Sequence, residues 1–139
     1  MSQIITPEPV TETIDELEFR VIPFDAYFAL GLMARLIKSV GPALGALSGL
    51  DPESDLSSLN VGHLREAFTS LEPGDAQKLA LELLRNTSVL IDDGGKVKPR
   101  VNLHSEEKFN RVFNGRLKTL FKVLALSLKV NFASFSAGS

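Results

Sequence analysis

The sequence predicts a mainly α-helical domain that carries one small β-hairpin, and three observations indicate this fold class. Apolar residues recur at spacings of three and four over most of the chain after residue 25, which is typical of amphipathic helices. Residues 89–101 instead place two short apolar runs on either side of an Asp- and Gly-rich turn, which is typical of a β-hairpin. The length of 139 residues fits one domain with its own core. We expect a single helical domain over residues 18–135.

Both ends of the chain are expected to be flexible. Residues 1–17 contain two prolines and few apolar side chains, and all five charged residues before Arg20 are acidic. The same residues lack the basic and apolar regions of a signal peptide. We therefore predict a flexible acidic arm over residues 1–17 and a flexible tail over residues 136–139. Residues 18–22 alternate like a strand, and this strand could join the hairpin.

The first predicted helix begins after Asp25, a favourable N-cap residue. Residues 26–34 are apolar on every side, so this helix should be central to a core or to an interface. Arg35 and Lys38 interrupt the apolar run too early for it to span a bilayer. We expect the helix to end near residue 40 and to be followed by a kink or a second short helix at Pro42.

The rest of the chain predicts further helices after a polar loop at residues 51–59. Apolar stripes over residues 61–71 and 76–84 predict two helices that form an antiparallel hairpin. From Ser105 to Lys129 one apolar stripe keeps its helical phase across Asn114-Gly115. This indicates either one long helix with a weak point or two helices nearly in line. Three lysines share a side off that stripe: Lys118, Lys122 and Lys129.

The residue types give little support for an enzyme. The chain has no Cys, and neither His63 nor His104 lies in a spaced metal or catalytic motif. The turn at residues 92–95 lacks the spacing of a calcium loop, so a plain hairpin turn is the better interpretation. We predict no catalytic, cofactor-binding or metal-binding residues and no cofactor.

Three classes of non-catalytic protein could account for parts of this sequence. Nine basic residues between Lys96 and Lys129 could contact nucleic acid, but the phenylalanines of that segment fall on the apolar stripe, where a core needs them. The apolar run after Asp25 could suggest a small membrane lysis protein, but its charges oppose this. An interaction protein without nucleic-acid or membrane partners remains, such as a helical structural or adaptor protein.

Three segments of the chain together carry a resemblance to a known protein family. The first is "FRVIPFDAYFALGLMARLIKSVGPALGAL", and the second is "LIDDGGKV" leading into "HSEEKFNRVFNGRL". The third is "LFKVLALSLKVNFASF", whose closing Asn131-Phe132 and Phe135 form the most specific feature. These segments cover most of the chain from Glu18 to Phe135. With them, the chain resembles the small α-helical tail assembly chaperones of long-tailed bacteriophages.

The resemblance implies a protein without enzyme activity that acts in the host bacterial cytoplasm and is absent from the mature virion. Such chaperones bind the tape measure protein, keep it soluble and bring tail tube subunits to it. Their genes often also encode a longer frameshift product. A homo-oligomer of this chain is possible, and the sequence leaves its oligomeric state undecided.

The resemblance also suggests where partners would bind. The first helix and the Leu-rich last helix could form an apolar groove for a client helix. The lysine row could steer the client, and the terminal phenylalanines could close this interface or a self-association interface. Whether these aromatic side chains belong to the core instead is open. The candidate interaction residues are Phe28, Leu32, Lys118, Lys122, Lys129, Asn131, Phe132 and Phe135.

Overall fold

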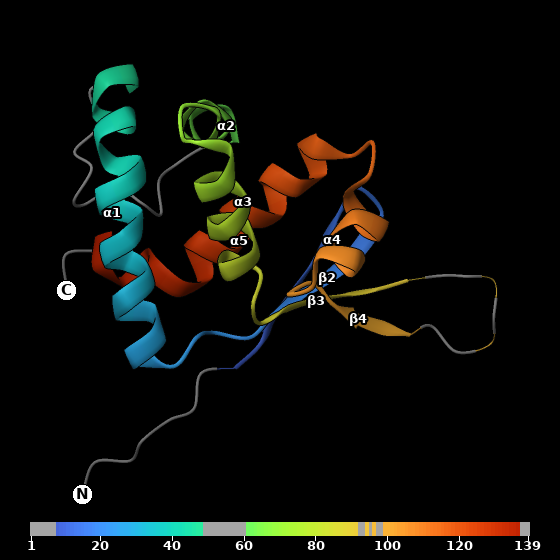
Figure 1. Cartoon of the computed structure of the whole chain (residues 1–139). Coiled ribbons are helices and arrows are strands. Elements are labelled where there is room, and N and C mark those ends of the chain that lie inside the picture. Colours follow the sequence, from blue (N-terminus) through green and yellow to red (C-terminus); the bar gives the residue numbers. More distant parts are fainter. Residues whose placement is uncertain (1–7, 49–60, 92–93, 95, 97–98, 137–139) are drawn as a thin grey trace, which may run out of the picture.

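The computed structural model describes the backbone of residues 8–48, 61–91, 94, 96 and 99–136, and the side chains of these residues except 40–48 and 133–136. Most of the helices gather at one end of the domain, and the sheet, with one helix packed on it, forms the other end (Figure 1). Helix α1 (Ala26–Ser48) lies at one extreme, and the hairpin of β3 (Thr87–Leu90) and β4 (Arg100–Asn102) lies at the opposite one (Figure 1). The elements are β1 (Val10–Ile14), β2 (Leu17–Val21), α1 (Ala26–Ser48), α2 (Val61–Thr69), α3 (Pro73–Leu83), β3 (Thr87–Leu90), β4 (Arg100–Asn102), α4 (Glu106–Phe113) and α5 (Leu117–Ser136).

The sheet is larger than the sequence predicted. Its four strands are antiparallel and follow the order β1-β2-β3-β4. The predicted hairpin within residues 89–101 is confirmed as β3 and β4, and the predicted strand at residues 18–22 is confirmed as β2, which pairs with β3. The described residues therefore form a mixed α/β fold with five helices, and the expectation of a mainly α-helical domain with a small hairpin holds only in part.

Strand β1 is the part of the sheet that the sequence missed. It covers residues 10–14, which were predicted to lie in a flexible arm, and pairs along its whole length with β2. The two strands are joined by Asp15 and Glu16, whose φ angles are +49° and +72°. This is the geometry of a two-residue hairpin turn, but the usual sequence signal is a glycine at such positions. Without that signal, the acidic composition favoured an unstructured arm.

One face of the sheet is apolar and is covered by α4. Phe19 pairs with Val89, Val89 pairs with Val101, and all three side chains are buried. The Phe113 ring of α4 stacks parallel to the Phe19 ring with centroids 6.3 Å apart. Every second side chain of β2 and β3 thus points toward the helices, as expected for a sheet with one buried face.

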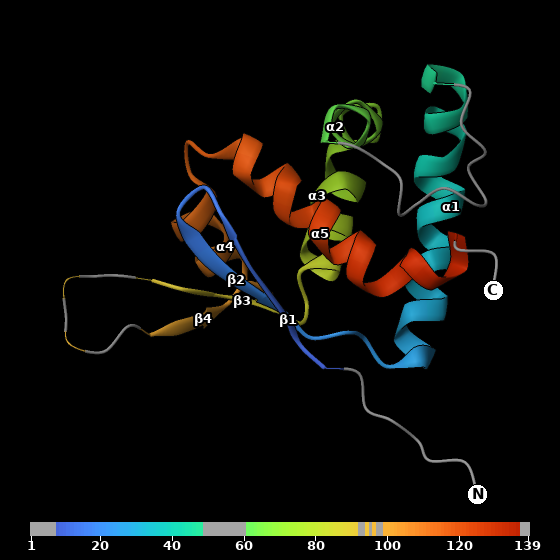
Figure 2. The same cartoon turned by 180° about the vertical axis from the view of Figure 1, so that it is seen from behind.

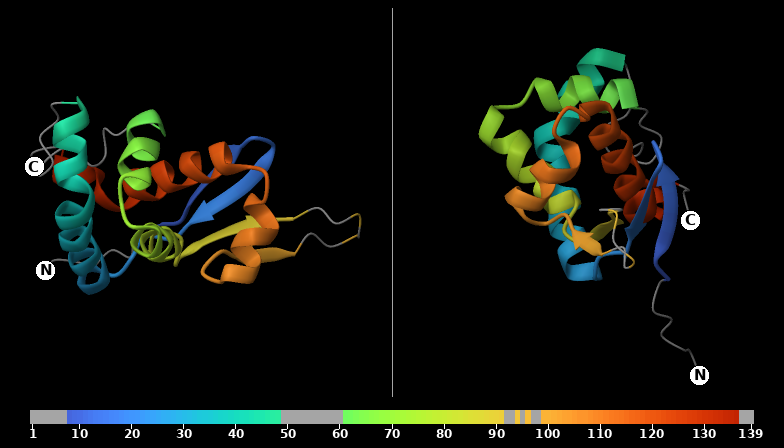
Figure 3. Two further views of the ribbon diagram at one scale, coloured as in Figure 1. Left: turned by 45° about the horizontal axis from the view of Figure 1, so that its top comes forward. Right: turned by 90° about the vertical axis from the view of Figure 1, so that its right-hand side faces the viewer.

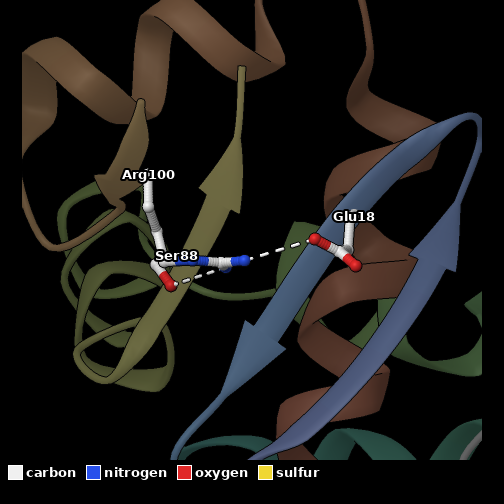
Figure 4. Close-up of polar contacts among 3 residues, drawn as sticks. All are labelled: Glu18, Ser88 and Arg100. Carbon is white, nitrogen blue, oxygen red and sulfur yellow. Dashed lines mark hydrogen bonds and ion pairs between the residues drawn. The ribbon is translucent and has the colours of Figure 1, made fainter. Parts of the chain in front are cut away.

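A polar contact crosses three strands on the sheet. The Arg100 guanidinium of β4 donates a 3.2 Å hydrogen bond to Ser88 Oγ on β3 and reaches Glu18 Oε2 on β2, also at 3.2 Å (Figure 4). Both charged side chains are partly exposed, so this ion pair adds little stability.

Helix α1 is longer than predicted. The Asp25 cap is confirmed, because its Oδ1 accepts a 2.8 Å hydrogen bond from the Phe28 N–H. The expected helix end near residue 40 and the second short helix at Pro42 are wrong, since α1 continues as one helix to Ser48. The residue before Pro42 is a glycine, whose missing Cβ removes part of the clash that normally keeps the residue before proline out of the helical conformation.

Two predicted helix arrangements are also corrected. Figure 1 shows α2 end-on and α3 from the side, so the two helices cross and do not form an antiparallel hairpin. Figure 3 shows the same crossing from another direction. Helices α4 and α5 are separate and are not in line, because the chain turns sharply between them at Gly115, where φ is +72° (Figure 3). The predicted loop at residues 51–59 and most of the 92–95 turn lie outside the described residues.

Helix α5 is the central element of the core. It contacts α2, α3, α4 and both strands of the first hairpin, and it crosses the molecule from that hairpin toward α1 (Figure 2). Ser127 lies within it at full burial and donates a 2.7 Å hydrogen bond to the Leu83 carbonyl of α3. Its buried apolar side chains are Leu120, Val123, Leu124, Leu126, Leu128 and Phe132. A helix that is apolar around most of its circumference belongs in a core, and α5 meets this expectation.

Candidate protein-binding surface

The start of α1 and the end of α5 are joined by Asn131. Its Oδ1 accepts a 2.8 Å hydrogen bond from the Phe24 N–H, and its Nδ2 donates at 2.9 Å to the Ser127 carbonyl within α5. We refer to these contacts as the Asn131 clasp. Because the clasp uses both ends of the amide, Asn131 has a structural role in the folded chain.

The five predicted apolar and amide positions lie at the same end of the domain, but two of them do not face solvent. Leu32 and Phe132 are buried in the core, with exposures of 0% and 1%. Phe28 is half-buried, lies edge-on to the Phe24 ring and is covered by the Arg85 guanidinium 4.5 Å from its centroid. Phe135 belongs to the last part of α5, but its side chain lies outside the described residues.

The three predicted lysines differ in their surroundings. Lys118 and Lys129 are exposed, whereas Lys122 Nζ lies 2.9 Å from Asp15 Oδ1 in the β1–β2 turn. Thr119 donates a 2.7 Å hydrogen bond to Asp15 Oδ2. The Thr119 hydrogen bond and then Lys122 hold the pKa of Asp15 below its ordinary value of 3.8. Lys122 therefore anchors the first hairpin to α5, while the other two lysines face solvent.

An apolar groove lies on the side of the domain formed by α2 to α5. Its volume is about 400 Å³, and one wall carries Leu117, which is 63% exposed. Two half-buried phenylalanines, Phe109 of α4 and Phe121 of α5, form part of its lining. The remaining lining residues are Phe68, Thr69, Leu71, Pro73, Ala76, Gln77, Ala80, Leu120 and Leu124.

A second hollow continues from this groove along α3 and α4. It has a volume of about 390 Å³ and shares Gln77 and Phe109 with the first. Its outer lining is polar and includes Lys78 and Glu106. The two hollows therefore adjoin each other, and charged side chains line part of the second hollow.

The observed groove differs from the expected one. It uses α5, as predicted, but pairs this helix with α2, α3 and α4 instead of α1. The sequence signal lay in the apolar stripe that crosses Gly115. The chain turns there, and both parts of the stripe contribute to the groove lining: Phe109 from α4, and Leu117, Leu120, Phe121 and Leu124 from α5.

The described part of the chain gives little support for a catalytic histidine, a metal site or a membrane-spanning helix. His63 is half-buried in α2, and His104 Nδ1 lies 2.9 Å from the Leu81 carbonyl. Among the residues that the structure describes, no three His, Cys, Asp or Glu side chains form a group that could hold a metal ion. None of the described helices is both long and apolar enough to cross a membrane.

An open apolar groove built by four helices is the kind of surface into which an amphipathic helix of another protein can pack. A family model described as "Phage tail assembly chaperone protein, TAC" matches residues 15–138, and the chain belongs to this family. The match spans strands β2 to β4 and all of the groove helices, and it begins just after β1. No curated protein and no solved structure matches the chain.

Proposed function

We propose that this protein binds the tape measure protein, keeps it soluble and recruits tail tube subunits during tail morphogenesis. It would do so without catalysis in the host bacterial cytoplasm and would be absent from the mature virion. Membership of the tail assembly chaperone family supports the general role. The observation that carries the proposal is the open apolar groove with Leu117 on its margin.

The groove suits a client that exposes apolar helices until other subunits cover them. An amphipathic helix can lay its apolar face into such a groove, where Leu117, Phe109 and Phe121 would contact it. Fully burying a leucine side chain contributes about 1.5–3 kcal/mol, and Leu117 is already partly covered. A few such contacts give a reversible affinity, which a chaperone needs in order to release its client.

The two exposed lysines of the predicted row would act at longer range. Lys118 follows Leu117 directly and lies beside the groove, whereas Lys129 lies three turns further along α5. Solvent-exposed charges change the rate of encounter more than the final affinity. We propose this steering role for both lysines, with Phe28 and Phe135 as further contact positions at the other end of α5.

The first test of this function measures binding of one client helix to the groove. The probes are synthetic peptides that each carry one apolar helical segment of the tape measure protein from the same phage. Leu117→Glu places a charge at the groove margin and should weaken binding of the best peptide at least about tenfold. Fluorescence anisotropy of a labelled peptide measures the Kd.

The matched control is Leu30→Glu, because Leu30 of α1 is similarly exposed, at 61%, and lies outside the groove. This variant should bind the peptide like the unmodified chain. Peptides that bind both variants equally well would place the client site elsewhere. A chain that binds none of the segments, and leaves the co-expressed tape measure protein insoluble, would favour an adaptor with another partner.

A further inference from the structure

The outward face of α1 is apolar, although this helix lies at the edge of the molecule (Figure 1). Tyr27 is 92% exposed and Leu30 is 61% exposed. Gly31 and Ala34 are exposed on the same side, and residues 26–34 carry no charge at all. A helix at a molecular edge ordinarily presents charged residues to water, so this face indicates an interface.

We call Tyr27, Leu30, Gly31 and Ala34 the α1 face, and its large and small residues are self-complementary. When two copies of α1 lie antiparallel around a twofold axis near residues 30 and 31, Leu30 lies opposite the partner's Gly31. Tyr27 then lies opposite the partner's Ala34. A Cβ added at Gly31 would meet nothing within 4 Å, so there is open space above this glycine. Each large side chain thus faces a small residue, which allows close helix packing.

The charges at the two ends of the α1 face favour the same arrangement. Asp25 precedes the face, Lys38 follows it, and both are exposed. In an antiparallel pair each Lys38 lies near the partner's Asp25, so opposite charges meet at both ends. A parallel pair would place the like charges side by side, which is unfavourable.

We propose that the α1 face docks on the α1 face of a second copy of this chain and forms an antiparallel, twofold-symmetric dimer. Such an interface uses the same patch on both copies. The face of one helix is smaller than a standard stable interface, so the dimer is reversible. The groove is lined by α2 to α5 and remains open on both copies. The proposal does not rest on the client that the groove binds.

Sedimentation equilibrium of the full chain, from low micromolar to near-millimolar concentrations, tests the dimer. The unmodified chain should show a monomer–dimer equilibrium. Leu30→Glu places two carboxylates near the twofold axis and should raise the dimer Kd at least about tenfold. Ala34→Arg fills the space opposite Tyr27 and should act in the same way. Both residues are exposed, so circular dichroism should show unchanged helix content in each variant.

Leu117→Glu is the matched control, because Leu117 is as exposed as Leu30 but lies at the groove. This variant should dimerise like the unmodified chain. A monomer at every concentration would overturn the proposal. A dimer that survives Leu30→Glu and Ala34→Arg, or that is lost with Leu117→Glu, would also overturn it.

Single cysteines test the antiparallel geometry, because the chain has no cysteine of its own. With a short bismaleimide crosslinker, Leu30→Cys should give a covalent dimer, since this residue lies close to its own counterpart near the axis. Lys38→Cys should not crosslink, because in an antiparallel pair its counterpart lies roughly 20 Å away along the helix axis. Crosslinking at Lys38→Cys without crosslinking at Leu30→Cys would overturn the antiparallel arrangement.

Discussion

At the scale of single residues, the side chains near the end of α5 hold the domain together. The Asn131 clasp satisfies the Phe24 N–H, and Phe132 fills the core one residue later. These positions were predicted as interaction residues on the strength of their unusual place in the chain. Their burial explains equally well why apolar and amide side chains stand there, because a partly buried backbone N–H needs a partner.

Replacing Asn131 with alanine should destabilise the domain. The Phe24 N–H would lose its acceptor, which costs about 1–3 kcal/mol. The higher helix propensity of alanine offsets up to about 0.7 kcal/mol of this loss. Urea denaturation measures the change in the free energy of unfolding.

Asn110→Ala is the matched control for that measurement. It makes the same exchange at an exposed position of α4, so only the helix propensity changes. Its effect should stay within about 0.5 kcal/mol. Equal losses in the two variants would mean that the Asn131 clasp contributes nothing to stability.

Asp15 should make the stability of the domain depend on pH. Its pKa in the folded chain is lowered by the Thr119 hydrogen bond and by Lys122, so the charged carboxylate stabilises the fold. This contribution is present above the ordinary pKa of 3.8 and is lost as the pH falls through the lower, folded value. Asp15→Asn keeps a residue that tolerates positive φ but removes the charge.

Thermal denaturation of both forms at several pH values tests this prediction. The unmodified chain should have the higher Tm at neutral pH, and the difference should shrink in acid below pH 3.8. The difference in Tm between the two forms should also become smaller at high salt, because the contact between Asp15 and Lys122 is partly exposed. A difference that stays constant over the whole pH range would assign the effect to the turn and not to the charge.

At the scale of elements, the β1–β2 hairpin is the clearest case in which tertiary structure overrode local sequence. A left-handed conformation costs a residue with a Cβ roughly 1–2 kcal/mol, and Glu16 adopts one at φ +72°. Pairing with β2 and the anchor to α5 through Asp15 offset this cost. Neither contact is visible in the local sequence.

Glu16→Gly should therefore stabilise the domain. Glycine removes the left-handed strain but loses about 0.5–1 kcal/mol in backbone entropy, which leaves a net gain of up to about 1.5 kcal/mol. Chemical denaturation checks the sign of the change. Glu12→Gly in the middle of β1 serves as the comparison and should destabilise, because glycine weakens a strand interior. Destabilisation by Glu16→Gly would show that the turn is not strained.

Elements with strong periodicity were predictable. The stripes after residue 60 indicated α2, α3 and α5, and the alternation around the Asp-Gly turn indicated β3 and β4. What failed was the geometry between elements. The apolar stripe keeps one helical phase across Gly115, but this glycine has a positive φ and redirects the chain. The periodicity of the sequence does not reveal a turn of this kind.

At the scale of the whole molecule, an apolar groove along the last helix could be predicted from the sequence, but the other helices that line it could not. The Leu-rich last helix was expected to form one wall, and it does. The partner helices depend on how α2 and α3 cross and on where α4 turns into α5, which are long-range properties. Residues 26–34 were expected to lie in a core or an interface, and the structure divides them between the buried Leu32 and the exposed Tyr27 and Leu30.

The Asn131 clasp also bears on how quickly and in what order the protein folds. It joins positions 107 residues apart in the chain. The sheet likewise needs β2 to pair with β3, which α1, α2 and α3 separate in sequence. Contacts between distant positions slow folding, because most of the chain must be ordered before they form. The domain should therefore fold slowly and cooperatively, and a growing chain completes its groove only after α5 has been synthesised.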